Sequence, residues 1–357
     1  MKAAVLTDRD VALEVRDDVE LVDLGPDSVH VKLVSSGVCH SDVSAQNGTI
    51  PSALPCVLGH EGAGVVQEVG SGVKGVKAGD HVIASFTPAC GVCRRCLGKQ
   101  PYLCELMHTT STLPTFKIDG EPVVAFCGLG TFSEEMVVNA AAVVPVPNEI
   151  PLNIASLIGC GVTTGVGASM WTAEVTPGSS VVVIGCGGVG IAAIQGARIA
   201  GAAEVVAVDT VESKLDHARR MGATHGVTPD QLEDAKRDVT AGDGFDFALE
   251  CIGHPDTIRQ AYDYTRRGGV AVVVGMGRFQ EEVSFNGFEL AYSAKTLKGS
   301  MYGSADVRTD FSKLLRLWQQ GKLDLEGMIS RRIALDDVND AFRAMQAGEV
   351  IRSVIDY

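Results

Sequence analysis

Hydrophobic residues in the first third of the chain follow a period of two. The run from Val29 to Val34 alternates apolar with polar side chains, and similar glycine-punctuated runs occupy residues 64–70 and 80–84. Residues 126–132 and 136–138 have the same character, and residues 143–147 lead out of this region. Alternation of this kind is typical of half-buried strands. The N-terminal part is therefore predicted to be a compact β-rich domain rather than a βαβ repeat.

The pattern changes after Pro151. Residues 153–158 are helical in composition, and Ser180–Ile184 is a continuous apolar run, as expected for a strand covered on both faces. Strands and helices then alternate, with a helix at 191–200, strands at 204–208, 245–249 and 269–274, and helices at 214–221 and 256–264. This order of elements predicts an α/β fold with a doubly wound parallel sheet.

The last sixty residues return to a mixed pattern, with helices expected at 308–320 and 338–347. We expect this tail to rejoin the β-rich domain. The predicted domains are a first domain of residues 1–160 and 297–357 and a second domain of residues 161–296.

Composition narrows the possible functions. A chain of 357 residues with 46% hydrophobic residues has material for two cores, and its 21% charged content argues against disorder. The formal charge of −14 would repel nucleic acid and anionic membranes, so neither is an expected partner. No apolar segment resembles a signal peptide, and Pro177, Gly178 and later glycines interrupt the uncharged stretch between Glu174 and Arg198. The cytoplasm is the default compartment.

Cys39 and His60 are the first candidate metal ligands. They lie about twenty positions apart, and each has a carboxylate nearby, Asp42 and Glu61. Cysteine and histidine are ligands that zinc prefers, and a neighbouring carboxylate can orient them. Cys160, between two glycines and close to threonines, is the candidate third ligand.

Four more cysteines form a second metal motif in a short polar segment: Cys90, Cys93, Cys96 and Cys104. Arg94, Arg95 and Lys99 lie between them, so four unrelated buried cysteines are a poor explanation. Four thiolates close a tetrahedron around zinc and leave no open position, which predicts a structural site. The remaining cysteines (Cys56, Cys127, Cys186 and Cys251) lack metal spacing and are interpreted as small apolar residues.

A glycine-rich turn follows the strand Ser180–Ile184 and opens the next helix; its residues are Gly185, Gly187, Gly188, Val189 and Gly190. Strand, turn, helix and the acidic residue Asp209 about twenty positions on together make the dinucleotide-binding fingerprint. The backbone and the helix N-terminus receive the pyrophosphate. Asp209 would accept the ribose hydroxyls of NAD and repel the 2′-phosphate of NADP, so NAD is the expected cofactor.

With these motifs in place, the sequence resembles the zinc-containing medium-chain alcohol dehydrogenases over essentially its whole length. The run from Gly59 to Gly64, continuing to Gly70 and Val73, matches the zinc motif of that family at every fixed position. The resemblance implies a GroES-like catalytic domain, a Rossmann domain and two zinc ions per chain. Cys39, His60 and Cys160 match the catalytic ligands, and the four clustered cysteines match the structural ligands.

The resemblance also implies roles for other residues. Ser41 matches the hydroxyl that takes the alcohol proton and passes it to the cofactor ribose. Asp42 would fix the tautomer of the ligand histidine, and Glu61 would tune the zinc charge or ligate it transiently; fold-supporting hydrogen bonds are the alternative for both carboxylates. Further cofactor contacts would come from His40, Thr164, Lys214, Val274 and Arg352. His40 has the alternative of a solvated loop residue, and His254 has the same two alternatives, a pyrophosphate contact or a loop position.

By the same resemblance the substrate channel is lined by Ile50, Phe86, Phe126, Cys127, Met276 and Met301. This apolar set suits a hydrophobic primary alcohol, aliphatic or aromatic, or its aldehyde. The branch that oxidises the glutathione adduct of formaldehyde holds its anionic substrate with charged groups. Ile50 lacks such a charge, so that activity ranks lower, although the loop at residues 105–122 does not exclude it.

Other functions remain open as alternatives. Polyol dehydrogenases usually replace the third cysteine ligand with glutamate, and Cys160 argues against them. A zinc-stabilised protein that binds a nucleotide without chemistry would not need Ser41 and three catalytic ligands. Residues 282–286 match the edge strand through which relatives dimerise, so a homodimer or a homotetramer is expected.

One departure from the family concerns Ser44, because many members carry a histidine at this position that ends the proton relay at solvent. Serine does not titrate near neutrality, so the last proton would pass to water or another base. We expect a weaker or displaced pH dependence of turnover than in members with the histidine. Comparing pH–rate profiles of the wild type and Ser44→His tests this, and identical profiles would contradict it.

Overall fold

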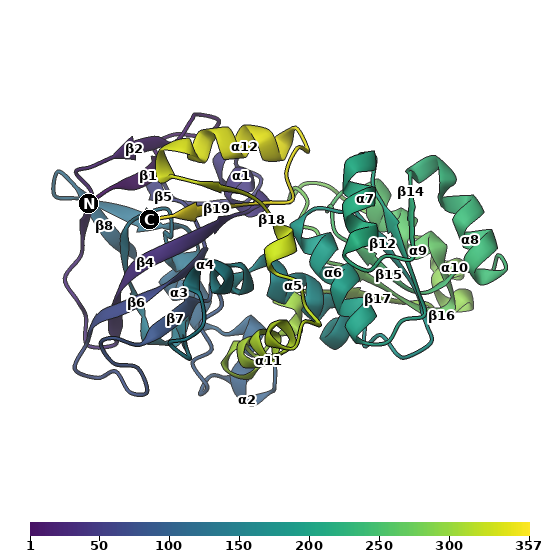
Figure 1. Ribbon diagram of the computed structural model, residues 1–357, viewed down its shortest axis with the longest axis horizontal. Coiled ribbons are helices and arrows are strands. Elements are labelled where there is room, and N and C mark those ends of the chain that lie inside the picture. The colour runs from purple at the N-terminus through teal and green to yellow at the C-terminus, as the bar shows by residue number, and fades with distance from the viewer. The chain divides into compact units, whose positions relative to one another are not determined.

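The computed structural model describes residues 1–357. The chain divides into two compact units (Figure 1). The first unit contains Met1–Cys160, Asp306–Arg316 and Ile329–Tyr357, and the second contains Gly161–Ala305 and Leu317–Met328.

The first unit holds a six-stranded sheet in the order β2-β1-β5-β9-β8-β3. Its strands are β1 (Ala3–Leu6), β2 (Glu14–Arg16), β3 (Glu20–Leu21), β5 (Cys56–Val57), β8 (Pro114–Ile118) and β9 (Glu121–Ala125). Ala3, Val5, Val57 and Phe116 pack in a buried cluster on this sheet. Strand β5, which directly follows Pro55, therefore lies between β1 near the N-terminus and β9.

A second sheet of the first unit follows the order β11-β7-β6-β4-β19-β18, and β10 also pairs with β4. Its strands are β4 (Ser28–Val38), β6 (Glu61–Val69), β7 (His81–Ala84), β10 (Glu135–Asn139), β11 (Val143–Val146), β18 (Ile329–Ile333) and β19 (Arg352–Asp356). The C-terminal strand β19 pairs with β4 in an antiparallel register, with Val354 opposite Gly37. The end of the chain thus returns to the β-rich unit.

Short helices complete the first unit: α1 (His40–Gln46), α2 (Arg94–Leu97), α3 (Leu106–Thr110), α4 (Leu152–Ala155) and α12 (Val338–Gln346). Helix α11 (Val307–Gln319) begins in this unit. Val338, Ala341, Phe342 and Met345 lie on one face of α12 at helical spacing and join a buried cluster with Val43 of α1.

The second unit is a parallel sheet with the order β14-β13-β12-β15-β16-β17. Its strands are β12 (Ser180–Ile184), β13 (Glu204–Val208), β14 (His225–Val227), β15 (Phe245–Glu250), β16 (Thr265–Val273) and β17 (Thr296–Gly299). Helices α6 (Gly188–Ile199) and α7 (Glu212–Arg220) lie on one side of this sheet, and α8 (Leu232–Thr240), α9 (Pro255–Tyr264) and α10 (Gly287–Ser293) on the other (Figure 1). Helix α5 (Gly161–Gly167) precedes them. This is the doubly wound arrangement that the alternating pattern predicts.

The prediction of a strand at residues 126–132 is wrong. Phe126–Gly128 is a 3₁₀ turn, and no strand follows it before β10. Cys127, Gly128 and Gly130 have φ values of 56°, 72° and 63°. Positive φ angles are incompatible with an extended strand, so this segment turns instead.

The expected edge strand at residues 282–286 is also absent, and the sheet ends at β17. Phe285 packs edge-on against Tyr262 of α9 with ring centroids 5.0 Å apart. Asn286 caps α10 by accepting the backbone N–H groups of Phe288 and Glu289. Both contacts hold the segment against helices rather than beside the sheet.

The tail does not rejoin the first unit as a whole, because residues 297–305 and 317–328 belong to the second unit. Strand β17 pairs with β16, which keeps its residues in the parallel sheet. Asp324 exchanges hydrogen bonds with Gln195 of α6 through its backbone N–H and C=O, at 2.7 and 3.1 Å. The predicted domain boundary at residue 297 therefore does not account for these contacts within the second unit.

No single helix is long and apolar enough to cross a membrane. Two helical segments joined by a bend, Leu152–Gly159 and Gly161–Thr172, are together long and apolar enough for a membrane span by length and composition alone.

Candidate metal and nucleotide-binding sites

The Asp42 carboxylate organises the first metal site. It lies on α1, and it accepts hydrogen bonds from the backbone N–H groups of Cys39 (2.9 Å) and Gly59 (3.1 Å) and from His60 Nδ1 (2.9 Å). The residue is fully buried. A carboxylate on Nδ1 fixes the imidazole tautomer, so the lone pair on Nε2 is left for another partner.

The geometry around His60 fits a metal ion. Its Nε2 is buried and has no hydrogen-bond partner in the protein. The ligand atoms of four buried residues lie within 4.8 Å of one another: Cys39, His60, Glu61 and Cys160. A buried polar atom without a partner is costly unless something binds it, and this donor set is that of a zinc site.

The two cysteines of this site are coupled electrostatically. A hydrogen bond from Cys160 is the main cause that lowers the pKa of Cys39 well below its usual range; burial opposes it, and Arg352 and His60 assist it. The same contact raises the pKa of Cys160. One thiolate is therefore already favoured before a metal binds, and the thiolate is the form that coordinates.

Glu61 and Arg352 form a buried ion pair beside these ligands. Arg352 Nη2 contacts Glu61 Oε1, and Nη1 donates to the Val38 carbonyl at 3.2 Å. Burial raises the pKa of Glu61 to about 7, and Arg352 opposes that rise. A β-carbon on Gly37 would lie 2.0 Å from Glu61 Oε2, so only glycine leaves room for this carboxylate. Sequence analysis missed Gly37, and no motif surrounds it.

The ion pair bears on the role predicted for Arg352. The residue is only 3% exposed, and its guanidinium faces Glu61 and Val38 rather than solvent. The pyrophosphate contact that the resemblance implies stays a prediction. Ser41 Oγ, the predicted proton acceptor, lies 3.8 Å from Cys39 Sγ, at the edge of the metal site.

Apolar side chains surround the ligand histidine. The rings of Phe86 and Phe126 meet the His60 imidazole edge-on, with centroids 5.9 and 5.5 Å away. Ile50 and Cys127 are partly buried and pack against the hydrophobic cluster that contains Phe126. Two predicted substrate-lining residues thus flank the metal ligand His60, and two more pack against the cluster that contains Phe126.

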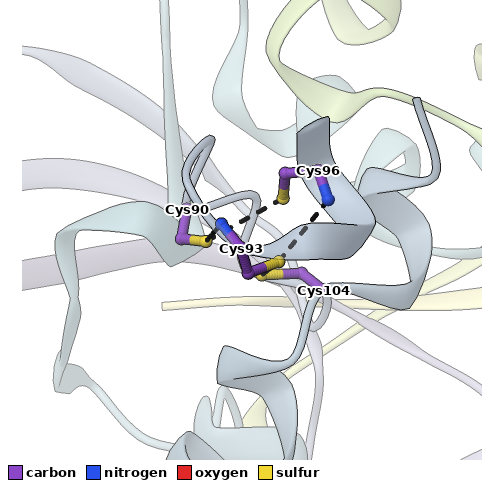
Figure 2. A group of neighbouring side chains, drawn as sticks. All are labelled: Cys90, Cys93, Cys96 and Cys104. Atoms are coloured by element: carbon purple, nitrogen blue, oxygen red, sulfur yellow. Dashed lines mark hydrogen bonds between the residues drawn. The ribbon is translucent and has the colours of Figure 1, made fainter. Parts of the chain in front are cut away.

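The four cysteines of the second motif converge in a separate cluster (Figure 2). Two pairs of sulfur atoms, Cys90 with Cys96 and Cys93 with Cys104, are each 3.9 Å apart. Zinc–sulfur bonds of about 2.3 Å at tetrahedral angles place sulfur atoms about 3.8 Å apart. The cluster therefore fits a four-thiolate zinc site, and the distances are far longer than a disulfide bond.

Backbone groups and one arginine support this cluster. The N–H of Cys93 donates to Cys90 Sγ at 3.4 Å, and the N–H of Cys96 donates to Cys93 Sγ at 3.5 Å. Arg308 of α11 lies close, because a β-carbon on Gly91 would be 2.9 Å from its Nη1. Sequence analysis missed Arg308, which is far from the cysteines in sequence.

The nucleotide fingerprint lies in the second unit. A β-carbon on Gly190 would be 1.8 Å from the Gly185 carbonyl oxygen, so the turn requires glycine there. Asp209 follows β13, and its carboxylate accepts the backbone N–H groups of Cys186 (2.8 Å) and Val211 (3.0 Å). The acidic residue therefore lies directly beside the glycine-rich turn.

Glu250, at the end of β15, is a residue that sequence analysis missed. Its buried Oε1 accepts the N–H groups of Ile252 (2.9 Å) and Gly253 (2.7 Å) and the hydroxyl of Thr257 (2.8 Å). Its backbone carbonyl accepts the N–H of Val274 at 2.8 Å. The sequence feature that could have identified Glu250 is its position as an acidic residue at the end of a predicted strand.

The other predicted cofactor and substrate residues are distributed over both units. His40 is exposed at the first position of α1, and His254 caps α9 by accepting the Asp256 N–H at 3.2 Å. Thr164, Lys214, Val274, Met276 and Met301 belong to the second unit. Met276 is 62% exposed and Val274 is buried. Their contacts with cofactor or substrate stay predictions.

Comparison with known protein families gives two matches, one largely in each unit. The family profile described as "Alcohol dehydrogenase GroES-like domain" matches residues 25–148, and "Zinc-binding dehydrogenase" matches residues 188–320. S-(hydroxymethyl)glutathione dehydrogenase of Paracoccus denitrificans is 37% identical over 97% of this chain and 98% of that protein.

Solved structures are similar across the whole chain. Benzyl alcohol dehydrogenase from Acinetobacter calcoaceticus has a TM-score of 0.93 at 31% identity, covering 99% of this chain and 98% of that one. A zinc-binding dehydrogenase from Sinorhizobium meliloti bound to NADP has a TM-score of 0.81 at 25% identity, covering 100% and 99%.

The fold and the two donor sets define a zinc-dependent oxidoreductase that uses a nicotinamide cofactor. The GroES-like and Rossmann domains and the whole-chain similarity narrow this class. The chain belongs to the zinc-containing medium-chain alcohol dehydrogenase family.

Replacing Asp42 with asparagine tests its role. Asp42→Asn removes the negative charge that orients His60, and we expect the affinity of the catalytic site for Zn²⁺ to fall about 10- to 100-fold. Competition with a chromophoric chelator measures this affinity, and the four-cysteine site is an internal reference. Asp80→Asn, which breaks the surface pair with Lys77, is the matched control. Unchanged zinc affinity in Asp42→Asn would contradict the assignment.

Removal of one clustered cysteine tests the second site. Cys104→Ala should lose one of two zinc ions per chain and destabilise the protein by about 4 kcal/mol, as is typical when a structural metal is lost. Elemental analysis and denaturant unfolding measure both quantities. Cys56→Ala is the control, because Cys56 is buried outside either cluster and should retain both ions. Two zinc ions in Cys104→Ala would refute the assignment.

Proposed function

We propose that this protein oxidises the hydroxymethyl group of a thiol–formaldehyde adduct with NAD⁺. The observation that carries the proposal is whole-chain similarity to a relative named S-(hydroxymethyl)glutathione dehydrogenase, at 37% identity. This reverses the ranking drawn from sequence, which placed hydrophobic alcohols first because the predicted channel is apolar and ranked the glutathione adduct lower because Ile50 is uncharged. The argument against the adduct rested on that one position, whereas the similarity extends over the chain.

The residues of the first metal site would have different roles in this reaction. Cys39, His60 and Cys160 would hold the catalytic zinc, and Asp42 keeps the imidazole in the tautomer that presents Nε2. When bound there, zinc would supply a Lewis acid for the substrate hydroxyl, and the nicotinamide would supply the hydride acceptor. Ser41 would take the hydroxyl proton and pass its own proton on to the cofactor ribose, and the rings of Phe86 and Phe126 exclude water from the histidine.

A hydrophobic or aromatic primary alcohol is the second candidate substrate. Phe86 and Phe126 flank His60, and Ile50 and Cys127 extend the apolar surface. Apolar walls with few polar groups suit such alcohols. The similarity to a benzyl alcohol dehydrogenase, with a TM-score of 0.93, supports the same candidate.

The preference for NAD over NADP rests on Asp209. Its carboxylate already accepts two backbone N–H groups beside the glycine-rich turn. A fixed negative charge at this position repels a 2′-phosphate and accepts ribose hydroxyls.

A panel of substrates in zinc-replete protein tests the proposal. We expect kcat/KM for S-(hydroxymethyl)glutathione to exceed that for benzyl alcohol and hexanol at least tenfold, and NAD⁺ to be favoured over NADP⁺ about 100-fold, equivalent to about 2.7 kcal/mol. NADH absorbance measures all four rates. Formaldehyde without glutathione is the control.

Each contrary result has one meaning. Higher kcat/KM for benzyl alcohol would replace the first candidate with the second. A preference for NADP⁺ would overturn the role of Asp209. Absence of turnover with every alcohol would favour a zinc-stabilised nucleotide-binding protein instead.

A further inference from the structure

Arg9 is a cation beside the turn that follows α1, and neither the motifs nor the proposed function gives it a role. Its guanidinium lies over the turn that follows α1. A β-carbon built on Gly48 would be 2.4 Å from Arg9 Nη1, 3.3 Å from Cδ and 3.4 Å from Cζ. The side chain therefore rests on the backbone at Gly48 rather than extending freely into solvent.

Hydrogen bonds hold the loop around Arg9 against the same turn. The N–H of Asp10 donates to the Gln46 carbonyl at 2.9 Å, and Gln46 Nε2 donates to the Val11 carbonyl at 2.7 Å. The loop and the end of α1 thus form one structural element. Its position relative to Arg9 is set by the backbone and by one amide side chain.

The guanidinium has no partner within the protein. Asp8 and Asp10 flank it in sequence, but Asp8 Oδ1 accepts the backbone N–H of Arg9 at 2.7 Å, and neither carboxylate forms an ion pair with the guanidinium. Arg9 is exposed to solvent. An arginine is always charged and has five donors, so this one is available to an external anion.

Sequence neighbours and packing contacts link Arg9 to the ligand histidine through Ile50 and Phe126. Ile50 follows Gly48 by two positions, and its N–H donates to the Ser44 carbonyl at 2.9 Å. Ile50 packs against the cluster that contains Phe126, whose ring lies 5.5 Å from that of His60. All of these residues belong to the first unit.

We propose that Arg9 determines specificity by binding a carboxylate on the thiol portion of the substrate. The inference rests on the proposed function. The reacting hydroxymethyl group must lie at the metal ligands, so the charged end of a peptide-like thiol would extend away from them past Ile50, a predicted channel residue. Arg9 supplies there the charge that Ile50 lacks, and a guanidinium binds a carboxylate with two parallel hydrogen bonds.

Kinetics of Arg9→Gln test this assignment. The variant should raise KM for S-(hydroxymethyl)glutathione about tenfold, leave its kcat within about twofold, and leave KM for benzyl alcohol unchanged. Arg9→Lys should restore part of the affinity. The difference between wild type and Arg9→Gln should shrink in about 0.5 M NaCl, because salt screens an exposed ion pair.

Arg331→Gln is the matched control. Arg331 is exposed on β18 of the same unit and forms no ion pair, so its removal changes the net charge equally. KM for S-(hydroxymethyl)glutathione should stay at the wild-type value in this variant. An equal rise in both variants would show a general charge effect and overturn the role of Arg9.

Two further results would overturn the inference and differ from failure of the proposed function. If wild type oxidises the glutathione adduct and Arg9→Gln has the same KM, the role of Arg9 is wrong and the function stands. If KM rises for the adduct and benzyl alcohol alike, Arg9 only supports the α1 turn. If wild type oxidises benzyl alcohol but not the adduct, the proposed function fails, and the role of Arg9 fails with it.

Discussion

The hydrogen bonds of one buried carboxylate determine the geometry of the catalytic metal site. Asp42 joins the start of α1 to the start of β6 by accepting N–H groups from Cys39, Gly59 and His60. The two ligands are about twenty residues apart, yet the same carboxylate orients both. A buried charge is costly unless it is fully hydrogen-bonded. The three hydrogen bonds therefore stabilise the Asp42 carboxylate and also orient the residues that donate them.

The surrounding fold is arranged so that this polar centre can be buried. Glu61 is adjacent to His60 and would add a second buried negative charge, which Arg352 of the C-terminal strand compensates. That contact requires glycine at position 37 of β4, the strand between β6 and β19. The last residues of the chain therefore contribute to the electrostatics of a site whose first ligand is Cys39.

Sequence reasoning succeeded where chemistry depends on local spacing. The four clustered cysteines, the Cys39–His60 pair and the glycine-rich turn each lie within a short segment, and the structure brings each group together. The strand at residues 126–132 was wrong because apolar composition does not reveal positive φ angles at Cys127 and two glycines. Three residues were missed because nothing near them in sequence marks their role: Arg308 and Gly37 contact residues far away in the chain, and Glu250 binds backbone N–H groups.

Substrate preference is the property least accessible to motif matching, for a physical reason. The side chains nearest His60 are apolar, and such walls would exclude water from the reacting carbon of an aromatic alcohol and of a thiol adduct alike. The two substrates share a terminal CH2OH group and differ in what it is attached to, an aromatic ring in one and the sulfur of a charged peptide in the other. A charge that distinguishes them can come from any segment that folds beside the apolar side chains, and Arg9, forty-one positions before Ile50, is the residue proposed for this role. Because Gly48 and Gln46 hold its loop, the cation is positioned by contacts that no single segment of the sequence contains.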